Sequence, residues 1–218
     1  MKKKSSPTVR AAATDRRTGR EPAATKKIRL LERKLAAARR EIAHLEAVAE
    51  TDFLLGIPNR RGFERELVRA IAYIKRYQAS GALIALDVDR LKPINDTFGH
   101  AAGDVVLKAV VEVLQQHVRA SDVLGRLGGD EFALLLWNLS KADAVAKAAA
   151  LEASVDRLAV AFGGHMISVG ISAGVMDIDL QAEAAEVLSR ADAAMYARKE
   201  ARRLQSIGQA SGARGQAS

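Results

Sequence analysis

Apolar positions near the start of the chain recur with the three- and four-residue spacing of an amphipathic helix. Over residues 25–50 this spacing is held by Ile28, Leu31, Leu35, Ala38, Ile42, Leu45 and Ala49. About three heptads of this kind predict a helix that could form a coiled-coil stalk with a second copy of the chain. An amphipathic helix packed on its own domain is an open alternative.

After residue 50 the pattern alternates between helix and strand periodicity. Residues 82–88 are almost entirely apolar, which is typical of a buried central strand. Two further apolar runs flank Gly128-Gly129-Asp130-Glu131 and predict a β-hairpin whose glycines take positive φ angles in a tight turn. Such alternation predicts one α/β layered domain over 51–205. Its other elements are helices over about 62–79, 103–118, 141–160 and 182–203 and a strand over about 167–175.

Composition removes several classes of protein. The 218 residues are 49% hydrophobic and contain no cysteine, which excludes disulfide scaffolds, thiolate metal sites and cysteine nucleophiles. No apolar run is long enough to predict a transmembrane helix. No apolar segment follows the N-terminal lysines, as it would in a secretory signal. We therefore expect a cytoplasmic protein.

The formal net charge of +8 is concentrated at the N-terminus. Residues 1–27 carry nine Lys and Arg, with Asp15 and Glu21 as the acids. A basic tail of this kind could contact nucleic acid or an anionic membrane surface. Because no aromatic residues are interleaved with the basic ones, a solvated, disordered tail over 1–24 is the better interpretation. The small and polar residues 206–218 are also predicted to be disordered.

Carboxylates occur at the end of a predicted buried strand and on the predicted hairpin turn. Asp87 and Asp89 end the predicted buried strand on one face, and Asp130 and Glu131 lie on the hairpin turn. A buried carboxylate is costly unless a positive partner accompanies it. A cation shared by the strand end and the turn would be such a partner, as Mg²⁺ is where it also binds substrate phosphates. The alternative is ordinary turn chemistry, with Asp89 capping the next segment and Asp87 paired with an arginine.

Five motifs occur in the order and spacing of a known family. They are Asp52…Gly56-Ile57-Pro58-Asn59-Arg60-Arg61, Asp87-Val88-Asp89…Lys92-Pro93-Ile94-Asn95-Asp96-Thr97-Phe98-Gly99-His100…Gly103-Asp104, Arg126-Leu127-Gly128-Gly129-Asp130-Glu131-Phe132, Val169-Gly170-Ile171-Ser172-Ala173-Gly174-Val175, and Ala191-Asp192-Ala193-Ala194-Met195-Tyr196…Lys199…Arg203. Together they resemble the GGDEF family of diguanylate cyclases over essentially all of residues 50–205. The resemblance implies a fold similar to the nucleotidyl-cyclase palm, a ferredoxin-like layered sheet. It also implies the conversion of two GTP molecules into cyclic di-GMP and two pyrophosphates.

The resemblance further implies roles for individual residues. Mg²⁺, with Mn²⁺ as the alternative, would be bound by Asp87, the Val88 carbonyl, Asp130 and Glu131, of which the last two would be catalytic. GTP would be bound at guanine by Asn95 and Asp104, at the phosphates by Lys92, Lys199 and Arg203, and through the bare backbone of Gly129. Cyclic di-GMP would bind as inhibitor at Arg119 and Asp122, which match the family's RxxD site.

The family chemistry also implies a homodimer. Each 3′-hydroxyl attacks the α-phosphate of the other nucleotide, so two GTP-loaded domains must face each other. The helix over 25–50 could hold them at high effective concentration. A catalytically weak domain that serves as a receptor for GTP or cyclic di-GMP is the alternative. The positions that depart from the family pattern are Leu55, Leu91, Pro93, Arg202 and Leu204.

Overall fold

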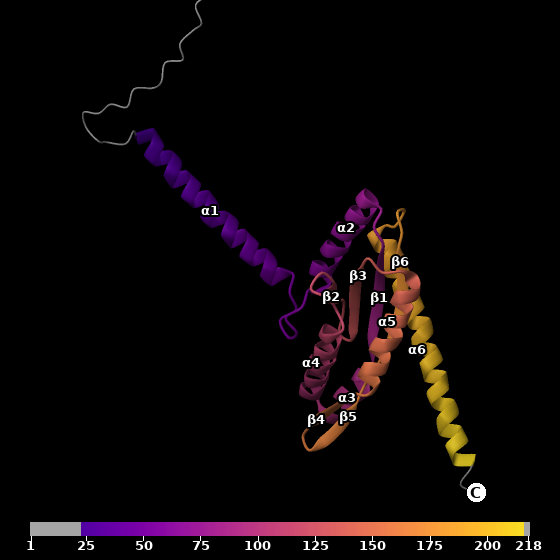
Figure 1. Cartoon of the computed structure of the whole chain (residues 1–218). Helices are drawn as coiled ribbons and strands as arrows, with labels where there is room; N and C mark the ends of the chain where they lie inside the picture. Colours follow the sequence, from indigo (N-terminus) through magenta and orange to yellow (C-terminus); the bar gives the residue numbers. More distant parts are fainter. Residues whose placement is uncertain (1–22, 216–218) are drawn as a thin grey trace, which may run out of the picture. The chain divides into compact units, whose positions relative to one another are not determined.

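The computed structural model describes residues 23–215 (Figure 1). The helices are α1 (Ala23–Ala49), α2 (Arg60–Tyr77), α3 (Leu91–Phe98), α4 (His100–Gln116), α5 (Lys141–Asp156) and α6 (Ala184–Gly215). The strands are β1 (Gly81–Asp89), β2 (Val123–Arg126), β3 (Glu131–Trp137), β4 (Ala159–Phe162), β5 (His165–Ser168) and β6 (Gly170–Ile178). The predicted basic tail over 1–24 lies outside the described residues, apart from its last two.

Four strands form one antiparallel sheet in the order β2-β3-β1-β6. The predicted buried strand, β1, is central and pairs with β3 on one side and with β6 on the other. β2 and β3 form the predicted hairpin. The sheet with its covering helices confirms the predicted α/β layered architecture.

Side chains of β1 alternate between two cores, because successive residues of a strand point to opposite faces of a sheet. Ile84 and Leu86 pack in one core with α4 and α5, whereas Leu83 and Ala85 pack in the other with α2 and α6. Both faces of β1 are therefore covered, which accounts for its continuous apolar run. The same alternation turns Asp87 toward α6.

Helix α3 follows β1 directly and is not predicted by the sequence pattern. Leu91 and Ile94 anchor it in the core, where they are 7% exposed. Pro93 lies in its first turn, where the missing backbone N–H has no partner within the helix and costs little. Two departures from the family pattern, Leu91 and Pro93, thus fit a short helix at this place.

Two predicted boundaries after α5 are wrong. The helix predicted over 141–160 ends at Asp156, and residues 159–168 form the hairpin β4–β5 instead. Gly163 and Gly164 lie at its turn with positive φ angles of 56° and 81°, which glycine adopts without strain. The strand predicted over 167–175 is accordingly divided between β5 and β6, and β6 runs on to Ile178.

The C-terminal helix differs in length from the prediction. α6 continues to Gly215, whereas the sequence predicts a helix that ends near residue 203 and a disordered tail over 206–218. No proline interrupts residues 204–215, and their Ala, Gln and Arg residues favour helix. Residues 216–218 lie outside the described residues.

Helix α1 carries the predicted heptads, and its residues up to Glu46 belong to a separate unit. Its apolar stripe is exposed: Ile28, Leu31, Leu35, Ile42 and Leu45 are each 53–58% exposed. Pairing of this stripe with a second copy stays a prediction. None of the helices between residues 23 and 215 combines the length and apolar character needed to cross a lipid bilayer.

Candidate active site

The end of β1 and the tip of the β2–β3 hairpin meet at one edge of the sheet. Asp87 lies opposite Glu131 in the β1–β3 pair. One residue further on, the Val88 N–H donates a hydrogen bond of 2.9 Å to the Asp130 carbonyl. Antiparallel pairing thus makes neighbours of the four residues that the sequence analysis assigns to a metal ion.

The turn of this hairpin differs from the predicted tight turn. Neither Gly128 nor Gly129 takes a positive φ angle, so that part of the prediction is wrong. A Cβ at Gly128 would meet Oε2 of Glu131 at 2.7 Å, whereas a Cβ at Gly129 would meet nothing within 4 Å. Gly128 therefore makes room for the Glu131 carboxylate, and Gly129 leaves open space beside the backbone.

Two arginines stabilise the turn through hydrogen bonds to backbone carbonyls. Arg126 donates from Nε to the Gly128 carbonyl at 2.9 Å and from Nη2 to the Gly129 carbonyl at 2.7 Å. Its Nη1 pairs with Asp52 at 3.0 Å. Arg60 Nε donates to the Leu127 carbonyl, just before the turn, at 2.8 Å. Arg126, Asp52 and Arg60 were given no role from the sequence, although all three occur in the family-like motifs.

Asp87 is buried and paired with a cation from α6. It is 6% exposed, and Lys199 Nζ lies 2.6 Å from its Oδ1. Burial raises the pKa of the Asp87 carboxyl above its ordinary value, the hydrogen bond from Lys199 works against this rise, and the charges of Asp130 and Asp89 add to it. The paired arginine considered in the sequence analysis is therefore a lysine, as the buried charge requires a positive partner.

The oxygen donors at this edge fit a hard divalent cation. Carboxylate and backbone carbonyl oxygens are the ligands that such ions prefer. Among the residues that the structure describes, no three Asp, Glu or His side chains are gathered into a metal cage. Instead, Lys199 supplies the positive charge that the buried Asp87 carboxylate needs.

A cavity of about 440 Å³ lies between α3, the start of α4 and the hairpin turn. It brings together five residues that the sequence analysis assigned to substrate or metal, namely Lys92, Asn95, Asp104, Gly129 and Asp130. Leu91, Asp96, His100, Gly103, Leu107 and Arg126 complete its lining. A cavity of this size with a few convergent polar groups is suited to a small-molecule ligand.

Asn95 has a buried acceptor at this cavity. Its Oδ1 is buried and has no hydrogen-bond partner within the described part of the chain. A Cβ at Gly103 would collide with this same oxygen, so the glycine makes room for the amide group. A buried polar atom without a protein partner calls for an explanation, and a ligand that donates a hydrogen bond supplies one.

The residues assigned to the phosphates are not gathered at one point. Lys92 lines the cavity, whereas Lys199 lies against Asp87. Arg203 is 66% exposed along its side chain and pairs with Glu200 at 3.1 Å. The preceding residue, Arg202, is the arginine of α6 that approaches the strand end.

Arg119 and Asp122 lie in the turn between α4 and β2, at the opposite end of β2 from the hairpin tip. The Asp122 carboxylate accepts hydrogen bonds from the backbone N–H groups of Arg119 at 2.9 Å and of Trp137 at 3.3 Å. The Arg119 side chain is exposed. Asp122 thus stabilises the turn, while the Arg119 guanidinium faces solvent.

Comparison with known proteins gives one family. Residues 49–205 match the family model described as diguanylate cyclase, GGDEF domain. The chain is 38% identical over 163 residues to the probable diguanylate cyclase DgcE of Escherichia coli K12, covering 74% of this chain and 15% of that protein. It is 39% identical over 165 residues to the diguanylate cyclase TpbB of Pseudomonas aeruginosa PAO1, covering 74% and 38%. The chain thus spans well under half the length of these relatives.

Solved structures agree with this match. The diguanylate cyclase SiaD of Pseudomonas aeruginosa, crystallised with its activator SiaC, is 34% identical with a TM-score of 0.68, covering 81% of this chain and 68% of that one. A structure of the coiled coil and GGDEF domain of DgcB from Caulobacter crescentus with c-di-GMP is 24% identical with a TM-score of 0.72, covering 83% and 96%. At that identity the second likeness concerns the fold alone. The predicted fold class is thereby confirmed.

Proposed function

The chain belongs to the GGDEF domain family of diguanylate cyclases, and from this premise we propose that it condenses two GTP molecules into cyclic di-GMP and two pyrophosphates. The observation that carries the proposal is the register of β1 against β3. It sets Asp87 opposite Glu131 and bonds Val88 to Asp130. A strand-end acid and an acidic turn beside an open cavity suit a site for a metal-bound triphosphate.

Members of this family use divalent metal ions. We assign the ion to Asp87, the Val88 carbonyl, Asp130 and Glu131, and we expect Mg²⁺, with Mn²⁺ as the alternative. When bound, the ion neutralises triphosphate charge and lowers the pKa of the attacking 3′-hydroxyl. The Lys199 ammonium donates a hydrogen bond to the Asp87 carboxylate. We expect this ammonium group to turn to the phosphates when nucleotide binds.

Recognition of guanine is assigned to Asn95 and Asp104. A carboxylate can accept hydrogen bonds from both N1–H and N2–H of guanine, a pair of donors that adenine lacks. Asp104 would therefore discriminate GTP from ATP. The unpaired Oδ1 of Asn95 supports its assignment, because a donor from the ligand would satisfy that buried atom.

The reacting groups follow from the same arrangement. The 3′-hydroxyl oxygen of one GTP forms a bond to the α-phosphorus of the other, and the bond from that phosphorus to pyrophosphate breaks. Asp130 is assigned to accept the hydroxyl proton. Lys92, Lys199 and Arg203 are assigned to the charge that develops on the leaving pyrophosphate. The open space at Gly129 supports a close approach of nucleotide to the backbone.

A single domain cannot complete this reaction, so we propose that two copies act as a homodimer. The exposed apolar stripe of α1 supports pairing through the heptads, which would raise the effective concentration of one catalytic unit near the other. We also propose that cyclic di-GMP inhibits the enzyme by binding to Arg119 and Asp122.

Incubation of the chain with GTP and Mg²⁺, followed by nucleotide chromatography, tests the proposal. We expect cyclic di-GMP and pyrophosphate to accumulate, and we expect Asp130→Asn to abolish this without loss of fold. The alternative function is a receptor that binds GTP or cyclic di-GMP without turnover. Binding of either nucleotide with no product formed would favour the receptor and contradict the enzyme.

A further inference from the structure

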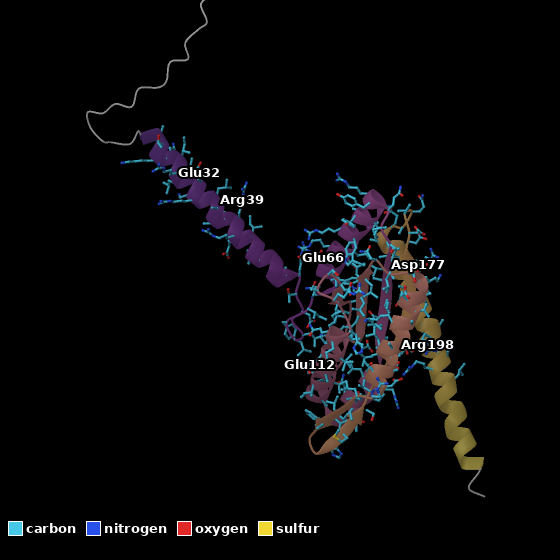
Figure 2. The ribbon with its side chains drawn as sticks, viewed as in Figure 1. Glu32, Arg39, Glu66, Glu112, Asp177 and Arg198 are labelled. Carbon is cyan, nitrogen blue, oxygen red and sulfur yellow. The ribbon has the colours of Figure 1, made fainter. Side chains whose placement is uncertain are left out.

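Three basic side chains of α6 pair with acids on the sheet or on α5. Arg198 is labelled in Figure 2, and Lys199 and Arg202 follow it on the same helix. The pairs are Arg198 with Glu152, Lys199 with Asp87, and Arg202 with Asp89, Asp156 and, at 3.7 Å, Glu152.

The third of these pairs involves a residue to which the family resemblance assigns no role. Arg202 is 22% exposed along its side chain, with Nη2 at 2.6 Å from Asp156 Oδ1 and Nε at 3.4 Å from Asp89 Oδ2. The other oxygen of Asp89, Oδ1, accepts a hydrogen bond of 2.9 Å from Ser172 Oγ. Both oxygens of Asp89 are thus engaged by groups of the protein itself.

The cluster depends on the absence of a side chain at Gly170, which lies opposite Asp89 in the β1–β6 pair. A Cβ there would meet Asp156 Oδ1 at 2.8 Å, Arg202 Nη2 at 3.0 Å and Asp89 Oδ2 at 3.1 Å. The φ angle of Gly170 is not positive, so space rather than backbone conformation requires the glycine. The three charged groups therefore converge on one point.

Asp89 would compete with Asp87 if it were left free. The two carboxylates are two residues apart on the same face of β1, and the charges of Asp87, Asp130 and Asp89 all act on the Lys199 ammonium. An unpaired Asp89 would therefore attract the same cations as Asp87, whether Lys199 or a divalent ion.

We propose that Arg202 is a positioning residue that retains Asp89 in the protein's own network, so that a divalent ion at the strand end meets Asp87 and not Asp89. The inference rests on the proposed function for the metal site. Arg202, one of the positions that depart from the family pattern, would then contribute to the mechanism.

Mn²⁺ binding to the full chain without nucleotide, measured by calorimetry at fixed ionic strength, tests the inference. Removal of Arg202 leaves a negative charge uncompensated near the site. We therefore expect Arg202→Gln to bind Mn²⁺ about tenfold more tightly while its turnover of GTP falls, because the ion is drawn toward Asp89. Adding Asp89→Asn to this variant should return the Mn²⁺ affinity to that of the unsubstituted chain. Arg202→Lys keeps a positive charge at this position and should also bind Mn²⁺ with the affinity of the unsubstituted chain.

Arg198→Gln is the matched control, because it breaks a pair between α6 and Glu152 of α5 without touching a strand-end carboxylate, and Glu152 keeps Arg202 as a partner at 3.7 Å. Its Mn²⁺ affinity should stay at the original value even if its melting temperature falls. Unchanged or weaker Mn²⁺ binding by Arg202→Gln would overturn the inference.

A second arm does not depend on the folding of Arg202→Gln. Asp89→Asn alone should reduce Mn²⁺ affinity far less than Asp87→Asn does, because it removes a nearby charge but not a ligand. Equal losses would make Asp89 a ligand and overturn the inference. Failure of the proposed function has a different signature, which is the absence of cyclic di-GMP from GTP while the Mn²⁺ affinities still follow this order.

Discussion

At the scale of single residues, the candidate site has two parts: the acidic edge of the sheet, where Lys199 pairs with Asp87, and the cavity beside α4. Asp87 is buried and held by Lys199, while Asn95 and Asp104 lie at the cavity beside α4. Charge dominates at the edge, because a buried carboxylate has to be paired. At the cavity, the buried Asn95 Oδ1 has no hydrogen-bond partner among the described residues, which leaves one acceptor unsatisfied there.

The assignment of Asp104 to guanine predicts a loss of substrate discrimination on substitution. Asp104→Asn keeps one acceptor but turns a donor toward the guanine edge. We expect kcat/KM for GTP to fall by about 10- to 100-fold, since hydrogen bonds to a charged group contribute about 1.5–3 kcal/mol. Steady-state kinetics with GTP and ATP measures the change. Asp96→Asn, at the same cavity, is the matched control and should cost much less.

The assignment of Arg119 to cyclic di-GMP predicts that its substitution weakens product inhibition. Its exposed guanidinium can bind a phosphate of cyclic di-GMP through two hydrogen bonds, so Arg119→Ala should weaken inhibition by about tenfold or more. Asp122 is a poorer choice of variant, because its carboxylate also stabilises the turn through backbone N–H groups. Initial rates at increasing cyclic di-GMP measure the effect. Non-competitive inhibition that persists unchanged in Arg119→Ala would refute the site.

At the scale of elements, the hairpin is held in place by contacts from the segment that precedes α2. Arg126 joins the turn carbonyls to Asp52, and the Arg126 N–H donates to the Pro58 carbonyl at 2.8 Å. The acidic turn therefore takes its position from residues far away in sequence. Its geometry depends on this support as well as on its own glycines.

Loss of the arginine should loosen the turn. Arg126→Ala removes hydrogen bonds to two carbonyls and leaves Asp52 without this partner. We expect the free energy of unfolding to fall by about 1–3 kcal/mol and amide exchange to speed up at residues 128–131. Hydrogen exchange with urea unfolding measures both. Arg69→Ala breaks an exposed pair with Glu66 on α2. It should change the free energy of unfolding by no more than about 0.5 kcal/mol and leave amide exchange at residues 128–131 unchanged.

The packing of α6 on β6 makes a second prediction at this scale. A Cβ at Gly174 would collide with the Met195 backbone nitrogen and approach the Ala191 carbonyl oxygen at 2.5 Å. Gly174→Ala should therefore displace α6 and lower the free energy of unfolding by about 1–3 kcal/mol. Because α6 carries Lys199, activity should fall as well. A urea midpoint equal to that of the original chain would contradict this close packing.

At the scale of the whole molecule, the proposed reaction needs two catalytic units and therefore a means of bringing them together. Helix α1 exposes its apolar stripe, and charged residues such as Glu32 and Arg39 project from its other positions (Figure 2). This pattern is typical of a helix that pairs with another helix. The domain that follows carries the site.

Disruption of the stripe should make activity depend on protein concentration. Leu35→Glu introduces a charge at the centre of the proposed seam. We expect specific activity at nanomolar protein to fall by about tenfold or more and to recover as concentration rises, because linkage through α1 supplies a high effective concentration. Sedimentation velocity with parallel activity assays measures both. Residues 1–218 that stay monomeric at micromolar concentration and keep their activity would contradict the role of α1.

The sequence predicted the parts of the fold that depend on local pattern. The apolar run of β1, the hairpin around Gly128-Gly129, and the α/β alternation were readable, because buried strands and helices leave local patterns of apolar residues. The geometry of the turn was not readable, since neither of its glycines takes a positive φ angle. The hairpin β4–β5 was missed because its two strands are short and follow a helix without a proline between them. The helix α3 was missed because its eight residues are too few to show a period.

What the sequence determined by itself was the buried strand β1, the β2–β3 hairpin, the α/β alternation and the identity of the acids and bases, because local apolar patterns record them. Which acid meets which base was decided by the tertiary structure. The pairing of Lys199 with Asp87, and the approach of Arg202 rather than Arg203 to Asp89, depend on how α6 is rotated against β6. That rotation is set by packing at Gly174 and Gly170 between segments distant in the chain, and no local pattern records it.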